Sequence, residues 1–355
     1  MKKLLSVLLS ITMGVALLAG CSPKQETVNT SAEKTNTEKT ETVEKSKFPE
    51  RPINLIVPFG AGGGTDAWNR AIAAALQENG WTVKVSNVTG GSAGSVGTMQ
   101  VWNAKHDGYT FAGTSETPLV IPVMAGDKQT TDSWEYYIAG GSPGVLCVNK
   151  NANIADFQAL IDATKANPGT VKIAGTSGGL WFLLASMLEY GGGIDLGVAT
   201  YDGSATAITA CISNETVAVA ASAGEVAEFV KSGDLIPVAT FQTTDFEQAD
   251  FGKVPAVTTL VPEVEKYLPL NQFIGFMIPK DTPEDVKAEI QKAFLAACDS
   301  KALKEFSDQN YGVIYKWVGE EADKNCAKAQ SIMSWMLYEM EKTEFNPADF
   351  NIPKP

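Results

Sequence analysis

Small and hydroxyl-bearing residues gather in five loops, each of which follows an apolar branched run and precedes a helical pattern. The loops are GAGGGTD (60–66), TGGSAGSVGT (89–98), GTSETP (113–118), GTSGG (175–179) and YDGSAT (201–206). Each loop offers unhindered backbone N–H groups, hydroxyls and a helix N-terminus, a combination that binds anions without Lys or Arg. A single glycine loop is ordinary turn chemistry, but five at corresponding strand ends predict one shared cleft.

The glycine spacing of the first loop does not fit a nucleotide-binding motif. A Walker A loop needs Lys and then Ser or Thr after its last glycine, whereas Thr65 follows Gly64 here. Gly60 and Gly62 begin the dinucleotide pattern G-x-G-x-x-G, but its sixth position is Thr65, and the second predicted strand ends without an acid for a ribose. The sequence contains no H-x-x-x-H pair and no acidic calcium loop. We therefore expect neither a cofactor nor a metal.

The strongest enzyme-like pattern is GTSGG, which fits G-x-S-x-G with Ser177 as a nucleophile between a strand and a helix. A triad would then need an acid and a histidine downstream, but the only histidine, His106, lies upstream in the loop KHDGY. Other chain orders are physically open, so a serine hydrolase that uses Ser177 is the alternative function from another class. The simpler interpretation makes Ser177 a hydrogen-bonding hydroxyl and His106 a surface loop residue.

Short branched runs alternate with helical patterns, which predicts an α/β fold with mostly parallel sheets covered by helices. In such sheets ligands collect beyond the carboxyl ends of the strands, where the glycine loops lie. Asp66 begins the first helix, where capping is its simplest role, and Trp181 and Phe182 are expected in the core, with one ring able to line the cleft. The tail from Pro283 to Glu341 reads as wholly helical. The predicted strands are Ile53–Val57, Thr82–Asn87, Tyr109–Gly113, Val145–Val148, Val171–Ala174, Val198–Thr200, Val217–Ala221, Ile236–Thr240 and Phe273–Ile278.

Residues 1–20 have the pattern of a signal peptide that is removed from the mature chain. Lys2 and Lys3 precede an apolar run that is too short and wrongly flanked to span a membrane. The run ends in Leu-Ala-Gly-Cys, which resembles the bacterial lipobox, so we expect Cys21 to carry a lipid anchor with a palmitate-type chain. The alternative is an ordinary signal peptide with an incidental cysteine. Residues 22–47, rich in Thr, Lys and Glu, cannot bury enough apolar surface to order themselves, so residues 21–47 are predicted to be a lipidated cysteine and a disordered tether.

The chain is acidic, with a formal net charge of −13 at pH 7. Removal of residues 1–20 takes away Lys2 and Lys3 and no acid, which lowers the net charge to −15. The tether carries balanced charge, so the folded part carries this excess. An acidic body argues against nucleic acid as a partner and against flat docking on anionic lipid.

Four cysteines remain beyond Cys21, namely Cys147, Cys211, Cys298 and Cys326. They stand singly in apolar segments without C-x-x-C or metal-binding spacing. We expect buried free thiols. A Cys298–Cys326 bridge between C-terminal helices is the alternative, which only their nearness in the sequence supports.

The loops and the segments around them resemble the extracytoplasmic solute receptors of the tripartite tricarboxylate transporter family, the TctC or Bug proteins. PINLIVPFGAGGGTD is similar to that family's opening strand and loop, and VSNVTGGSAGSVGT to its second glycine loop, with one apparent extra residue. The segments DGYTFAGTSETP, IAGTSGGLW, ATYDGSATAI, SGDLIPVAT, KVPAVTTLVPE and FIGFMIPKDTPEDV follow in the family's order. The similarity runs from about Pro52 to the C-terminal helices.

The resemblance implies a fold of the type II periplasmic-binding-protein class, in which two α/β lobes close around a hinge cleft like a Venus flytrap. Residues 48–141 and 277–355 would form lobe 1 and residues 142–276 lobe 2, with crossings near Ser142 and Phe276. The family commonly holds small carboxylates through backbone amides, hydroxyls and bridging waters. The binding roles that the resemblance implies fall on Gly62, Gly63, Thr65, Asp66, Gly90, Gly91, Ser92, Ala93, Gly94, Thr114, Ser115, Thr176, Ser177, Gly178, Asp202 and Gly203.

One position departs from the family pattern. Many members have Lys or Arg between the Tyr and Gly where this chain has Asp202. If Asp202 faces the cleft, a dianionic ligand is disfavoured, and a monocarboxylate, an amino acid or a neutral compound fits better. The alternative is that Asp202 only caps the helix that starts at Ser204.

The resemblance thus implies a non-catalytic receptor that captures a small organic, carboxylate-bearing solute. We expect a monomer, anchored to the outer face of the cell membrane through Cys21, that passes its solute to multi-span permease subunits. A solute sensor subunit is a further alternative, and it predicts the same cleft.

Overall fold

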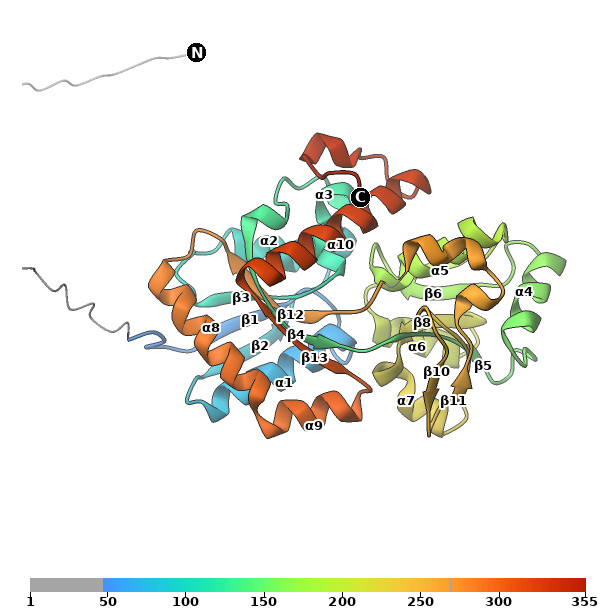
Figure 1. Cartoon of the computed structure of the whole chain (residues 1–355), viewed down its shortest axis with the longest axis horizontal. Coiled ribbons are helices and arrows are strands. Elements are labelled where there is room, and N and C mark those ends of the chain that lie inside the picture. The colour runs from blue at the N-terminus through green and yellow to red at the C-terminus, as the bar shows by residue number, and fades with distance from the viewer. Residues whose placement is uncertain (1–46, 269) are drawn as a thin grey trace, which may run out of the picture. The chain divides into compact units, whose positions relative to one another are not determined.

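Figure 1 shows the computed structural model of the chain, which describes residues 47–268 and 270–355. The predicted signal peptide, the lipidated cysteine and nearly all of the predicted tether lie outside these residues. The described residues all belong to one compact unit. Within the described part of the chain, no helix is both long enough and apolar enough to cross a bilayer.

The first sheet has six strands in the order β13-β4-β12-β3-β1-β2. Consecutive residues of these strands enter cores on opposite faces, because side chains alternate along a strand. Leu55 and Phe276 face the side covered by helices α1 and α8, whereas Ile56 and Met277 face the side covered by α2 and α10 (Figure 1). The strands are β1 (Ile53–Val57), β2 (Val83–Asn87), β3 (Thr110–Ser115), β4 (Trp134–Gly141), β12 (Ile274–Pro279) and β13 (Val313–Val318).

The second sheet has five strands in the order β7-β6-β8-β5-β9, and a separate hairpin pairs β10 with β11. Here too both faces are covered. Leu146 contributes to a core shared with α5, and Cys147 to a core shared with α6 and α7. The strands are β5 (Gly144–Asn149), β6 (Ile173–Thr176), β7 (Val198–Tyr201), β8 (Ala218–Ser222), β9 (Leu235–Thr240), β10 (Phe246–Gln248) and β11 (Gly252–Val254).

The helices follow the strands with end signals visible in the sequence. The first helix places Trp68, Ile72 and Leu76 in the core and ends at Asn79 and Gly80, and Gly80 has a left-handed backbone. The helices are α1 (Gly64–Glu78), α2 (Ser95–Trp102), α3 (Ile121–Ala125), α4 (Phe157–Ala166), α5 (Leu180–Gly192), α6 (Ser204–Ile212), α7 (Ala223–Lys231), α8 (Glu284–Asp299), α9 (Lys301–Gln309) and α10 (Gly319–Glu339).

The chain passes from the first sheet to the second between Gly141 and Gly144, and β12 brings it back. Because β12 pairs in the first sheet from Ile274 onward, the return comes slightly before the predicted crossing near Phe276. The two sheets and their helices form two α/β lobes, as the fold-class prediction had it.

All nine predicted strands are present, with ends displaced by two residues at most. The prediction of mostly parallel sheets is wrong. β12 runs antiparallel to both β3 and β4, and β5 runs antiparallel to both β8 and β9. The strands that lead into and out of the second lobe therefore run against their neighbours. Their apolar runs look the same in either direction, so composition alone did not reveal the reversal.

The prediction of a wholly helical tail is also wrong, because β13 (Val313–Val318) interrupts it and pairs with β4. This edge strand is irregular. Its register shifts between Ile314 and Trp317, and Lys316 has a left-handed φ of 58°. Such a bulge breaks the simple alternation of side chains that marks a strand in a sequence.

The four cysteines of the described chain are free and buried, as expected. The alternative Cys298–Cys326 bridge is wrong, because Cys298 packs in the core beneath α1 and α8, whereas Cys326 packs in the core on the opposite face of the sheet. Burial raises the pKa of each thiol well above its ordinary value.

Candidate functional site

Four of the five predicted loops meet around one small cavity between the sheets. Its volume is about 20 Å³, room for about one water molecule. The lobes therefore lie in close contact here. The lining residues are Gly60, Gly63, Gly64 and Thr65 from the first loop, Ser115, Glu116 and Thr117 from the third, Thr176 from the fourth, Gly203 and Ser204 from the fifth, and outside the loops Phe59, Trp181 and Gln272.

The first and fifth loops lie so close together that a single added Cβ atom would already contact the opposite loop. A Cβ atom on Gly203 would lie 3.4 Å from the backbone nitrogen of Gly60, and one on Gly63 would lie 3.2 Å from Ser204 Oγ. These loops come from opposite lobes, because the first follows β1 and the fifth follows β7.

The second loop, residues 89–98, does not line this cavity. It reaches the other lobe nearby, since a Cβ on Gly178 would lie 3.3 Å from the backbone nitrogen of Ala93. Ala93 and Gly94 are buried, whereas Gly90 and Ser92 are half-buried and Gly91 is exposed. The second and fourth loops therefore form a second contact between the lobes.

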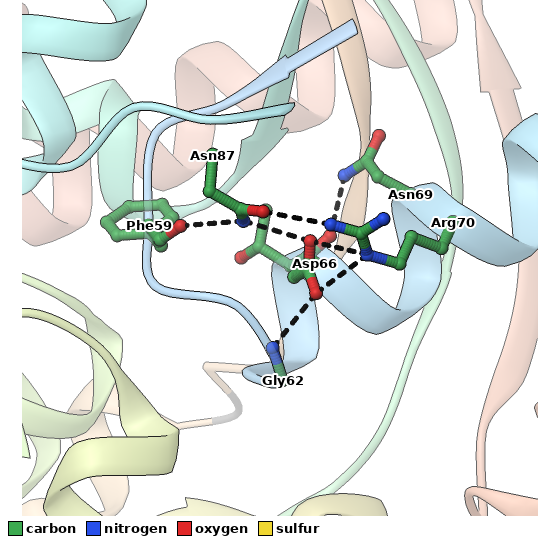
Figure 2. A network of polar contacts seen from close by, with 7 residues as sticks. Phe59, Gly62, Asp66, Asn69, Arg70 and Asn87 are labelled. Atoms are coloured by element: carbon green, nitrogen blue, oxygen red, sulfur yellow. Dashed lines mark hydrogen bonds and ion pairs between the residues drawn. The ribbon is translucent and has the colours of Figure 1, made fainter. Parts of the chain in front are cut away.

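The carboxylate of Asp66 organises the first loop, as Figure 2 shows. It accepts hydrogen bonds from Gly62 N at 2.9 Å, Asn87 Nδ2 at 2.9 Å, and Arg70 Nε at 2.9 and 3.0 Å to its two oxygens. Asn87 Nδ2 also donates to Phe59 O at 2.9 Å. Burial acts to raise the pKa of Asp66, but the hydrogen bonds from Arg70, Gly62 and Asn87 outweigh it and hold the pKa below its ordinary value.

This network explains how the loop keeps its shape. Gly62 has a left-handed φ of 83°, which a residue with a side chain adopts only at a cost. The N–H group of Gly62 is fixed by the Asp66 side chain one turn later. Asp66 thus supports the first loop without facing the cavity, because its oxygens accept hydrogen bonds from Arg70 and Asn87 of lobe 1 (Figure 2).

A second carboxylate, Glu225 of α7, reaches the first loop from the other lobe. Its Oε1 accepts a hydrogen bond from Gly64 N, the first residue of α1, at 2.6 Å. Its Oε2 accepts from Ser222 Oγ at 2.5 Å and from Ser222 N at 3.2 Å. The pair Ser222 and Glu225 is a capping box at the start of α7, a pattern that is visible in the sequence. The contact between Glu225 and Gly64 is not visible in the sequence, because 161 positions separate the two residues.

Glu116 was also missed, although it lies inside the third predicted loop. Its side chain is buried, and its Oε2 accepts a hydrogen bond from Phe273 N at 3.1 Å. Burial raises the pKa of Glu116 to about 8, and the negative charge of Glu225 adds to the rise. The carboxyl group is therefore mostly protonated at neutral pH. It also lines a neighbouring cavity of about 170 Å³ between α5, β13 and α10.

A larger hollow of about 520 Å³ lies at the crossing segments, around Ser142, Asn271 and Tyr311. None of the five glycine loops lines it. Its size alone does not make it the site, because it lacks converging helix N-termini.

The serine-hydrolase alternative finds no support in the geometry. Ser177 is half-buried, and its backbone nitrogen donates to Tyr201 O at 3.0 Å. His106 contacts Asp281 Oδ1 through Nδ1 at 2.5 Å and Trp102 O through Nε2 at 2.8 Å. Among the described residues, no hydrogen bond joins Ser177 to His106.

The remaining predicted residues differ in how deeply they are buried. Thr114 and Ser115 are buried at the end of β3, and Ser115 Oγ accepts from Thr117 N at 3.2 Å. Asp202 is exposed and does not line the cavity. The alternative role for Asp202, capping the next helix, is not observed, because Gly203 is the N-cap of α6 and no side chain caps it.

Two α/β lobes that enclose a cavity between glycine loops define a bilobal solute-binding protein of the periplasmic-binding-protein type. Residues 69–329, more than half of the chain, match the tripartite tricarboxylate transporter family receptor, TctC. The chain belongs to this family of extracytoplasmic solute receptors. BugT of Bordetella pertussis strain Tohama I is 29% identical over 271 residues, which cover 74% of this chain and 81% of BugT.

Solved structures share the fold. MatC (Rpa3494) of Rhodopseudomonas palustris with bound malate has a TM-score of 0.72 and 17% identity, and the match covers 82% of this chain and 100% of MatC. R. palustris Rpa4515 with adipate has a TM-score of 0.74 and 18% identity, with 83% and 98% coverage. At such identities the likeness concerns the fold.

We predict that Asp66→Asn destabilises the fold by about 3 kcal/mol, because an amide nitrogen would face donors that now share a buried carboxylate. Urea unfolding measures this change. As a control, Asp107→Asn removes an exposed ion pair with Arg51 and should cost under about 1 kcal/mol. The contribution of the Asp66 charge to the free energy of unfolding should also be lost as pH falls below the ordinary pKa of aspartate. The lowered pKa means that the folded state favours the ionised carboxylate, which protonation removes. Equal effects of the two substitutions would contradict the role of Asp66.

Glu116 should make the folded state less stable as pH rises. Its pKa is about 8 in the folded state against an ordinary 4.5, so the folded chain holds a proton that the unfolded chain releases between these values. The stabilisation is complete below pH 4.5 and is lost up to pH 8, on the order of 3 to 5 kcal/mol.

The measurement compares the free energy of unfolding of the wild type with that of Glu116→Gln, which mimics the protonated acid, at pH 5 and pH 8.5. Glu225, Tyr315 and Lys328 are the ionisable groups that face Glu116 or share its cavities, and they are the same in both proteins. Parallel pH profiles would refute the prediction.

Proposed function

We propose that this receptor captures a small carboxylate-bearing solute between its two lobes and delivers it to the permease subunits of a tripartite tricarboxylate-type transporter. The observation that carries the proposal is the convergence of the first and fifth loops, from opposite lobes, at the N-termini of α1 and α6. Among the described residues that line the cavity there is no Lys or Arg. Recognition of an anion must then rely on backbone N–H groups, hydroxyls and helix dipoles.

The proposed binding residues follow from this arrangement. Gly63, Thr65, Ser115, Thr176 and Gly203 line the cavity directly. Ala93 and Gly178 form the neighbouring contact between the lobes, the rest of Gly90 to Gly94 flanks Ala93, and Asp66 shapes the first loop. A solute that touches donors from both lobes stabilises the closed form, because only that form provides both sets of contacts. The malate and adipate bound to the two solved structures are small organic acids, which supports a carboxylate-bearing solute.

We expect the solute to be found with a thermal-shift panel of small carboxylates, amino acids and neutral metabolites. A solute at about 100 times its Kd stabilises the folded state by roughly 2.7 kcal/mol, which raises the unfolding midpoint measurably. The compound that shifts the midpoint is then titrated by calorimetry.

Gly203→Val should weaken binding of that solute at least about tenfold, since a side chain here would wedge the fifth loop away from Gly60. The fold should be unaffected, because Gly203 has φ of 179° and ψ of 166°, an extended backbone that any residue adopts. Thr209→Val, on the exposed side of α6, is the control and should bind normally. Undiminished binding by the Gly203 variant would place the site elsewhere.

The lipid anchor is part of the same proposal. The lipobox-like segment that ends at Cys21 and the polar tether after it support a receptor that is held at the membrane yet free to reach a permease. Cys21→Ser should release the protein from the membrane fraction into the soluble extracytoplasmic fraction, as fractionation and immunoblotting would show. Continued membrane association of the variant would contradict the anchor.

A further inference from the structure

The N-terminus of α1 is already occupied by a carboxylate of the protein itself. Glu225 Oε1 accepts the hydrogen bond of Gly64 N at 2.6 Å, across the contact between the lobes. A charged acceptor at this distance from a helix N-terminus is a strong interaction. It is also the kind of interaction that a solute carboxylate would make at the first glycine loop.

Further hydrogen bonds hold the Glu225 carboxylate in place. The second oxygen of Glu225 is fixed by Ser222 through both Oγ and N. A solute carboxylate that replaced Glu225 would have to break these contacts and leave a negative charge beside its own.

The described residues around Glu225 that line the cavity supply no cation for a second solute anion. Asp66 lies in the first turn of α1, and its charge is balanced by Arg70. Glu116 lines the same cavity as Gly64 and senses the charge of Glu225, which raises its pKa. Lys328 does not line this cavity but lines the neighbouring one, which Glu116 also lines. The α1 end of the site therefore holds the carboxylate of Glu225 at Gly64 N, the protonated carboxyl group of Glu116, and no lysine or arginine side chain among the described residues that line the cavity.

The N-terminus of α6 differs from that of α1. Its N-cap, Gly203, has no side-chain cap, and both Gly203 and Ser204 line the cavity. Its N–H groups and the hydroxyl of Ser204 supply an anion-binding position that no carboxylate of the described chain fills. The cavity has room for about one water molecule, so a solute carboxylate reaches this position only when the lobes part.

We infer that Glu225 determines the specificity of the cleft by holding the anion position at α1, so that the solute carries a single carboxylate, bound at α6, and turns an uncharged or ammonium group toward Glu225 and Glu116. This inference rests on the proposed function and names the class of solute. It assigns selectivity to Glu225 and Glu116 rather than to the exposed Asp202.

The test compares the affinity for a dicarboxylate with the affinity for its monoamide, which has nearly the same size but one negative charge fewer. The probes are adipate with its monoamide and glutamate with glutamine, titrated calorimetrically against the full receptor. The wild type should bind each monoamide more tightly than the diacid. Glu225→Gln removes the charge and keeps one acceptor oxygen, while its amide nitrogen faces the remaining donor. The readout is therefore the ratio of two affinities, and the affinity for adipate relative to its monoamide should rise about tenfold or more.

Glu228→Gln is the matched control, because Glu228 lies on the same helix, is 81% exposed and pairs with Lys231 outside the cleft. It should leave the ratio of the two affinities unchanged. A ratio for Glu225→Gln equal to that of the wild type, or no gain of adipate binding in that variant, overturns the inference. So does a wild type that prefers the diacids. Failure of the proposed function is a separate result, in which no compound of the broader panel shifts the wild-type unfolding midpoint.

Discussion

The start of α1 can be reached from the second lobe because the chain before it carries almost no side chains. From Gly60 to Gly64 the only side chain is the methyl group of Ala61, and Asp66 fixes this backbone through the N–H group of Gly62. The fifth loop can then approach to within van der Waals distance of Gly60. Bulkier residues would keep the lobes apart, and neither the contact between loops nor the Gly64–Glu225 hydrogen bond could form.

Much of the fold could be predicted from the sequence, because buried strands and amphipathic helices leave local patterns. The runs at Ile53–Val57 and Val145–Val148 and the helix ended by Asn79 and Gly80 are examples. Strand direction could not be predicted in this way. β5 and β12 are apolar on both faces, and their antiparallel pairing depends on where the chain enters each sheet. β13 was hidden by its bulge at Lys316.

The part of the candidate site that is formed by backbone groups of the glycine loops could be predicted from the sequence. Glycine and hydroxyl loops have a local signature, and four of them do line one cavity. The acids were less accessible to sequence reasoning. Asp202 stood out because it replaces a basic residue in a family pattern, yet it is exposed. Glu116 and Glu225 carry no such signal, because their importance comes from burial and from a contact between distant segments. Whether the individual loop residues bind the solute stays a prediction.

The four unpaired thiols bear on how this protein matures. Each is enclosed by apolar side chains of a finished core, so neither folding nor the closed arrangement of the lobes requires an oxidant or a disulfide isomerase. The described part of the chain can reach the same topology in a reducing or an oxidising compartment. Its thiols become reactive only when a core opens. Their reaction with a thiol reagent would therefore measure local unfolding of the core that contains them.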